Sequence, residues 1–85
     1  MSARIESEIL QQVTARGPDV SICPSEVARA LDPVAWRPLL TPVRRAATRL
    51  AQTGRIEILR KGRPVDPNAE IKGVIRLRLG TGAAG

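Results

Sequence analysis

The side chains with the clearest chemical potential are cationic or polar, and they gather in two stretches of the second half of the chain. The first stretch has helical spacing and comprises Arg44, Arg45, Thr48, Arg49 and Gln52. The second surrounds a glycine and comprises Arg60, Lys61 and Arg63. Guanidinium groups bind phosphate oxygens or guanine edges, and Thr and Gln side chains read base edges. Both stretches therefore predict recognition of nucleic acid, with these residues as the binding set.

The net charge of +6 is unevenly distributed along the chain. Residues 1–36 carry three Lys/Arg and five Asp/Glu, whereas residues 37–85 carry eleven Lys/Arg and three Asp/Glu. A clustered positive field attracts a polyanion more strongly than the same charges dispersed over a surface. The charge pattern therefore favours nucleic acid as the partner, and it leaves an acidic protein partner open as the alternative.

Residues suited to catalysis or metal binding are few. Histidine is absent, so the commonest general base and zinc ligand is missing. Cys23 precedes Pro24 at a predicted helix start, where a thiol either packs and caps the helix or gains reactivity from the helix dipole. Glu26 and Asp32 are placed as helix caps and not as a facing acid–base pair. We therefore predict a protein that is not an enzyme and uses no metal or cofactor, with a redox role of Cys23 left open.

Apolar residues at helical spacing predict three helices. The first extends from Ser2 to about Arg16 and ends at Gly17-Pro18. The second extends from Pro24 to about Leu31, and the third from Thr41-Pro42 to Thr53. The residues predicted to be buried are Ile5, Ile9, Leu10 and Val13 in the first, Val27, Ala30 and Leu31 in the second, and Val43, Ala46, Ala47 and Leu50 in the third.

Short β-prone segments account for most of the remaining chain. Residues 20–22 favour a small edge strand, and residues 55–58 and 74–79 alternate polar and apolar side chains as half-buried strands do. The residues predicted to face inward are Ile56, Ile58, Ile75, Leu77 and Leu79. Residues 61–68 are rich in turn formers, and we expect them to form a loop too long for a tight hairpin.

The connection between the second and third helices holds the only aromatic residue, Trp36. A short turn through residues 34–36 is expected here, and Pro38 is expected to end or bend it. We expect Trp36 to fill the core between this connection and the hairpin. The connection is longer than the turn of a compact helix-turn-helix, and the extra turn with Trp36 is expected either to tilt the third helix or to present a surface of its own.

The order of the predicted elements is helix, short strand, two helices and a hairpin. This order is that of a winged helix-turn-helix, so we predict an α+β fold with three main helices and a small antiparallel β-hairpin wing. Eighty-five residues allow a single core. We therefore expect one domain over residues 1–79 and a flexible tail at 80–85.

No apolar run reaches the ~20 residues needed to span a bilayer, and the first residues lack an apolar signal segment. A single cysteine cannot form an internal disulfide, which suits a reducing compartment. We therefore expect a cytoplasmic protein without membrane contact. No spare helix is predicted for a dimer interface, so a monomer or a weak homodimer is expected.

Two motifs, CPSEVAR at residues 23–29 and RKGRPVDP at residues 60–67, resemble those of an uncharacterised family of small bacterial winged-helix domains of unknown function. Further matching residues are Trp36-Arg37, Val43-Arg44, Ala47, Leu50, Gly54-Arg55-Ile56, Gly73 and Ile75-Arg76-Leu77. The resemblance covers roughly residues 5–79. It implies the winged-helix fold and a bacterial origin, and it brings no activity, cofactor or catalytic residue.

These observations together predict a binder of duplex DNA, and a small transcriptional regulator is one protein of that kind. The third helix is expected to enter the major groove, which is about 12 Å wide, while the wing contacts the backbone. Residues 61–64, Lys-Gly-Arg-Pro, resemble the Arg-Gly-Arg-Pro core of AT-hook motifs with lysine in place of the first arginine. A lone tryptophan cannot form the stacking platform of single-strand binders. A protein-interaction or accessory domain is the alternative.

Overall fold

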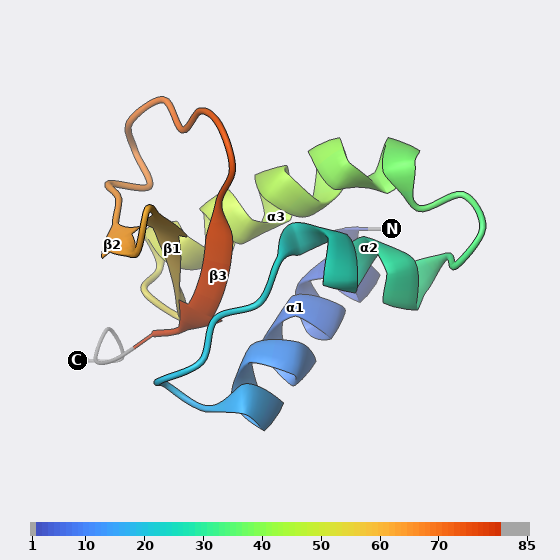
Figure 1. Cartoon of the computed structure of the whole chain (residues 1–85), viewed down its shortest axis with the longest axis horizontal. Coiled ribbons are helices and arrows are strands. Elements are labelled where there is room, and N and C mark those ends of the chain that lie inside the picture. Colours follow the sequence, from blue (N-terminus) through green and yellow to red (C-terminus); the bar gives the residue numbers. More distant parts are fainter. Residues whose placement is uncertain (1, 81–85) are drawn as a thin grey trace.

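The computed structural model describes residues 2–80 and shows three helices packed against a small antiparallel sheet (Figure 1). The helices are α1 (Ser2–Arg16), α2 (Pro24–Leu31) and α3 (Leu40–Gln52), and a 3₁₀ turn, η1 (Arg37–Leu39), leads directly into α3. The strands are β1 (Ile56–Arg60), β2 (Arg63–Pro64) and β3 (Arg76–Leu79). The predicted α+β class and the three predicted helices are confirmed. Residues 81–85 of the predicted tail lie outside the described residues.

The sheet has the order β2-β1-β3, with antiparallel pairing throughout. The predicted edge strand at residues 20–22 is reduced to one antiparallel bridge between Ile22 and Leu77 of β3. The two residues exchange both backbone hydrogen bonds, with N···O distances of 2.7 and 2.8 Å. The segment before α2 is therefore bonded to the edge of β3 that does not pair with β1.

The connection after β1 differs from the loop expected at residues 61–68. The chain reverses at once through Lys61 and Gly62, so that Arg60 pairs with Arg63 and Leu59 with Pro64. Both turn residues have positive φ, 54° and 79°, as a two-residue turn that matches strand twist requires. The predicted pairing of residues 55–58 with residues 74–79 across a long connection is confirmed, but the sequence did not indicate the tight turn and short strand β2 within that connection, where Gly62 supplies the conformation that the turn needs. Residues 65–75 then form a long loop, the β2–β3 loop, that returns to β3.

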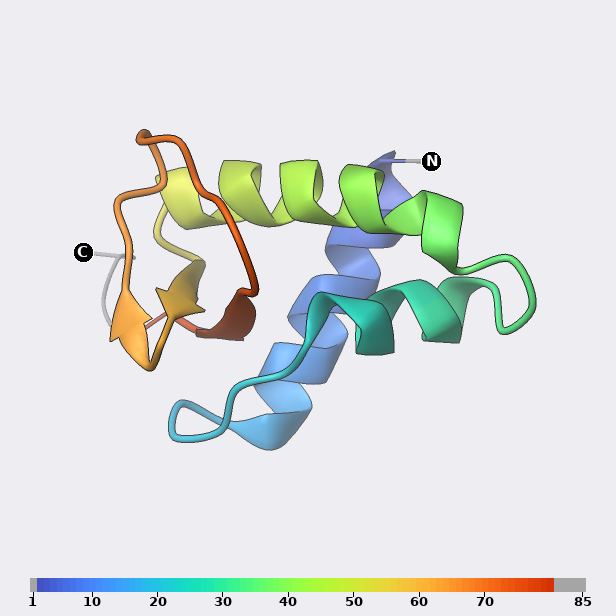
Figure 2. The same ribbon diagram turned by 45° about the horizontal axis from the view of Figure 1, so that its top comes forward.

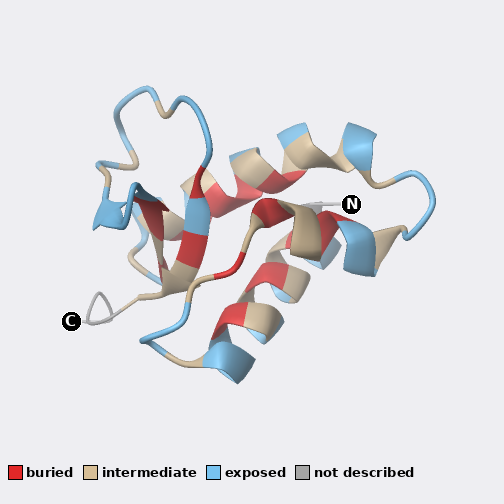
Figure 3. Ribbon diagram, viewed as in Figure 1, coloured by how far each residue is buried: buried red, intermediate tan, exposed pale blue. Residues whose placement is uncertain are grey.

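One hydrophobic core is shared by all three helices and the sheet, and its buried residues face inward in Figure 3. All the predicted inward residues of α3 are buried, as are Ile56, Ile58, Ile75 and Leu77 of the sheet region. In α2 the buried alanine is Ala28, whereas Ala30, predicted to be inside, is exposed. Pro24, Val27, Ala28 and Leu31 lie on one helical stripe, and Ala30 falls outside it.

The α2–α3 connection is ordered by polar groups and by a partly buried ring. The carboxylate of Asp32 accepts hydrogen bonds from the backbone amides of Val34 and Ala35, at 3.1 and 2.9 Å. Trp36 packs against the margin of the core, and the guanidinium carbons of Arg29 and Arg37 lie 4.3 and 4.6 Å from its ring centroid. The expected core filler is thus a half-buried ring with two cations beside it. Pro38 does not end the turn, because it lies inside η1.

In the part of the chain that the structure describes, no helix combines the length and the apolar composition that crossing a membrane requires.

Candidate nucleic-acid interface

Helix α3 presents one buried and one outward face. Val43, Ala46, Ala47 and Leu50 recur at helical spacing and fasten the helix to the core. The opposite face therefore projects away from the core. Of the predicted binding residues on it, Arg45, Arg49 and Gln52 are exposed, and Arg44 and Thr48 are half-buried.

Arg44 is engaged with the protein's own backbone. Its guanidinium donates one hydrogen bond to the carbonyl of Gly73 at 3.0 Å and another to the carbonyl of Ile71 at 3.2 Å. Both acceptors belong to the β2–β3 loop, so Arg44 fastens this loop to the side of α3. Figures 1 and 2 show the loop passing beside the half of α3 that leads to β1. The sequence could not indicate this role, because the partners lie 27 and 29 residues away.

Arg49 and Thr48 are also partnered. Arg49 forms an ion pair with Glu6 of α1, with Nε and Oε2 3.0 Å apart, and Thr48 donates its hydroxyl hydrogen to the carbonyl of Arg44 at 3.0 Å. The charge of Arg49 is therefore partly neutralised at the α1–α3 junction. Of the three α3 arginines, only Arg45 has no hydrogen-bonding or ion-pair partner among the described residues.

The second predicted group lies at the tip of the β1–β2 hairpin. Arg60, Lys61 and Arg63 are exposed, and none of them forms an ion pair with a described residue. Arg60 and Arg63 are direct cross-strand partners, an arrangement of like charges that costs stability. Lys61 occupies a left-handed conformation that few residues other than glycine and asparagine adopt. The tip therefore concentrates positive charge at some cost to the fold.

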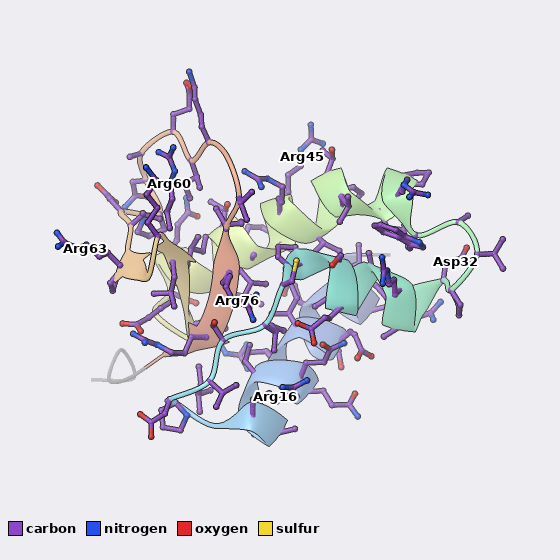
Figure 4. The ribbon with its side chains drawn as sticks, in the orientation of Figure 1. Arg16, Asp32, Arg45, Arg60, Arg63 and Arg76 are labelled. Carbon is purple, nitrogen blue, oxygen red and sulfur yellow. The ribbon has the colours of Figure 1, made fainter. Side chains whose placement is uncertain are left out.

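The two groups are brought together in part. Figure 4 shows Arg45 and Arg60 on the same side of the molecule, with the β2–β3 loop rising beside them, while Arg63 points outward from the sheet edge. The guanidinium of Arg60 lies against Gly73, where a Cβ would be 3.5 Å from it. Arg44 and Arg60 therefore approach Gly73 from different elements. Arg49, in contrast, is directed to α1.

A hollow of about 240 Å³ separates the outer side of α3 from the β2–β3 loop. Its lining residues are Thr41, Arg44, Arg45 and Thr48 from the helix and Ala69, Ile71 and Ile75 from the chain after β2. A second hollow, of about 220 Å³, lies on the other side of Arg44 and is lined mainly by apolar groups around Leu40, Val74 and Ile75. Neither hollow was predicted, because each forms where segments distant in sequence meet: the first between the β2–β3 loop and α3, and the second between these two and residues 23–25 at the start of α2.

Cys23 has a capping environment at the start of α2. Its backbone amide donates to the carboxylate of Glu26 at 2.7 Å, and the hydroxyl of Ser25 donates to its sulfur at 3.1 Å. Glu26 also pairs with Arg16 at 3.3 Å. The predicted reach of Glu26 back to the helix cap is confirmed. Among residues 2–80 no group of three or more His, Cys, Asp or Glu side chains is placed to hold a metal ion.

Comparison with known proteins yields a family but no described function. No curated protein matches the sequence. The model of a family described as "Protein of unknown function (DUF3253)" matches residues 2–80, which is the whole of the described fold. An uncharacterised family is what the resemblance in the sequence implied, and the chain belongs to this family of proteins of unknown function.

Proposed function

We propose that this protein is a winged-helix domain that binds duplex DNA through α3 and the β1–β2 hairpin. The single observation that carries the proposal is a set of exposed cations without ion-pair partners among the described residues. On α3 and the β1–β2 hairpin this set comprises Arg45, Arg60, Lys61 and Arg63, whereas other exposed arginines without ion pairs, such as Arg4 and Arg55, lie on other elements. Unpaired, exposed guanidinium and ammonium groups are what a phosphate backbone requires, because each contact releases a condensed counterion.

The topology supports the winged-helix assignment. Ile22 pairs with β3, and β3 pairs with β1. In the chain, α2 and α3 lie between Ile22 and β1. A helix followed by a hairpin with exposed cations is suited to groove and backbone contact. The cytoplasm of a bacterial cell is the location that we expect for this function.

The proposal divides the predicted binding residues into two roles. Arg44 positions the β2–β3 loop and Arg49 fastens α3 to α1, so their guanidinium groups are already occupied. Arg45 and the hairpin cations are assigned the phosphate contacts. Gln52, exposed near the end of α3, and Thr48 are retained as candidates for reading base edges.

Fluorescence anisotropy with a labelled mixed-sequence duplex at several salt concentrations tests this function. The slope of log affinity against log salt is negative, and the double variant Arg60→Gln/Arg63→Gln is expected to lower its magnitude by about 2, because each lost phosphate contact contributes ~0.9. Arg45→Gln is expected to lower it by about 1. Lys61→Asn is a useful addition, since asparagine suits the turn conformation while the charge is lost.

Matched controls remove the same number of charges elsewhere. Arg4→Gln/Arg16→Gln takes two charges from α1, and Arg55→Gln takes one from the segment before β1. Both controls should leave the salt slope within experimental error. Equal losses in the controls and in the hairpin variants would show that only net charge matters, and absence of duplex binding at physiological salt would refute the proposal.

A protein partner is the second candidate, and the α2–α3 connection favours it. Val34 is 92% exposed there, close in sequence to Trp36 and its two arginines. An apolar side chain beside cations suits an acidic partner with an apolar contact point. If this candidate is correct, Val34→Ser abolishes the capture of an acidic protein, whereas Arg60→Gln/Arg63→Gln does not.

A further inference from the structure

The hollow between α3 and the β2–β3 loop has two walls of different chemistry. Thr41, Arg45 and Thr48 form one polar stripe along α3, because they are spaced at helical intervals. Ile71, half-buried, and Ile75, buried, form the facing wall with Ala69. A space of about 240 Å³ with a cationic side and an apolar side suits an amphipathic molecule and not a bare ion.

The polar wall offers groups that are available to a ligand. Arg45 has no ion-pair partner among the described residues, although Glu70 lies in the facing loop and pairs instead with Lys72 at 3.1 Å. The Thr48 hydroxyl donates its hydrogen to the carbonyl of Arg44 and keeps its acceptor capacity. The guanidinium of Arg45 can bind a planar carboxylate with two parallel hydrogen bonds, and the Thr48 oxygen can accept a hydrogen bond from a donor group elsewhere on the ligand.

The hollow is held open by the fold before any ligand arrives. Arg44 donates to Ile71 and Gly73 at 3.2 and 3.0 Å and so fixes the distance between the helix and the loop. Ile75 is anchored in the core at the loop's far end. A preformed site loses less conformational entropy on binding than a site that must be ordered.

We propose that this hollow binds a small organic anion, with a carboxylate head on Arg45 and a short apolar body against Ile71 and Ile75. A hollow of about 240 Å³ limits the ligand to a small acid. The neighbouring hollow around Leu40 and Val74 is a weaker candidate, because its one cation, Arg44, is already bound to the loop. This inference does not depend on duplex binding.

Titration of the ¹⁵N-labelled protein, followed by amide chemical shifts, tests the proposal. Hexanoate and benzoate represent aliphatic and aromatic acids, hexanamide and benzamide their neutral counterparts, and inorganic phosphate the charge alone. One of the two acids is expected to bind with a dissociation constant of roughly 1 mM and to shift amides in residues 41–48 and 69–75. The amides and phosphate, at matched ionic strength, should bind about tenfold more weakly.

Two variants separate this site from general attraction to a basic protein. Arg45→Gln is expected to weaken binding of the acid about tenfold, through loss of a charge-assisted hydrogen bond. Arg55→Gln removes an exposed arginine outside the hollow and should leave affinity unchanged. Equal effects of the two variants, equal binding of the neutral amides, or shifts spread over the whole surface would overturn the proposal.

Discussion

At the scale of single residues, the position of Gly80 depends most strictly on the absence of a side chain. Its backbone amide donates to the carbonyl of Arg55 at 3.0 Å and so continues the β1–β3 pairing. A Cβ at this position would collide with the carbonyl oxygen of Gly54 and would lie 2.8 Å from the carbonyl carbon of Arg55. All these neighbours are backbone atoms, which cannot rotate away. Backbone contacts with the segment before β1 therefore extend one residue past β3, to residue 80, which the sequence placed at the start of a tail.

We expect Gly80→Ala to lower the free energy of unfolding by about 1–3 kcal/mol, as overpacking against fixed atoms does. Urea denaturation measures this change. Gly62→Asn is the matched control, because residue 62 has open space around its Cβ position and asparagine accepts positive φ. If Gly80→Ala lowered the free energy of unfolding no more than Gly62→Asn does, the segment before β1 and Gly80 would have to separate easily.

At the scale of elements, the β2–β3 loop is held to the rest of the fold by a few well-defined contacts. At its start, the Val65 amide donates to the carbonyl of Ile58 at 2.9 Å, and the Asp66 carboxylate accepts from the Asn68 amide at 2.9 Å. In its second half, Arg44 supplies the hydrogen bonds from α3. The loop is thus held beside α3 by the two hydrogen bonds of Arg44 and by the packing of Ile71 and Ile75 against the core.

Arg44→Met keeps most of the apolar stem and removes both hydrogen bonds. Each such bond contributes about 0.5–1.5 kcal/mol, so amide hydrogen exchange in residues 69–75 is expected to accelerate by roughly tenfold or more. Exchange in α1 and β1 should be unchanged. Arg45→Met is the control, because Arg45 is the neighbouring arginine and has no hydrogen-bonding partner among the described residues. Acceleration of exchange across the whole chain would instead indicate that Arg44 contributes to global stability.

At the scale of the whole molecule, a single core joins segments that are distant in sequence. Helix α1 contacts α2, α3 and β3, and its Ile9 is fully buried. The Ile22–Leu77 bridge and the Arg49–Glu6 ion pair link the first and second halves of the chain. Because every helix and the sheet share this core, the described fold is expected to unfold in one cooperative step.

Ile9→Ala tests this expectation, since it removes a large side chain at the centre of the core. The substitution should lower the free energy of unfolding by about 2–5 kcal/mol. Far-UV circular dichroism, which reports the helices, and fluorescence of Trp36, in the α2–α3 connection, should give the same midpoint. Two separate midpoints would show that the α2–α3 connection unfolds independently of the core.

The sequence alone determined the three helices, β1, β3 and most of the residues they bury, but not β2. Helical spacing in α1 and α3, proline at the start of α2 and alternation in β1 and β3 act over a few residues, so they can be read without tertiary contacts. The phase of α2, with Ala28 inside in place of Ala30, was missed because a helix of eight residues offers few apolar positions to fix its inward face.

Only the tertiary structure decided which cations are available to a partner. Arg44 and Arg49 resemble Arg45 in the sequence, yet their partners lie 27 to 43 residues away and neutralise or occupy them. The hollow beside α3 and the closure of the sheet at Gly80 likewise need the β2–β3 loop and β3 to return to earlier segments. Charge and periodicity are local properties of a chain, whereas the partner of a long side chain is set by which distant backbone the fold brings beside it.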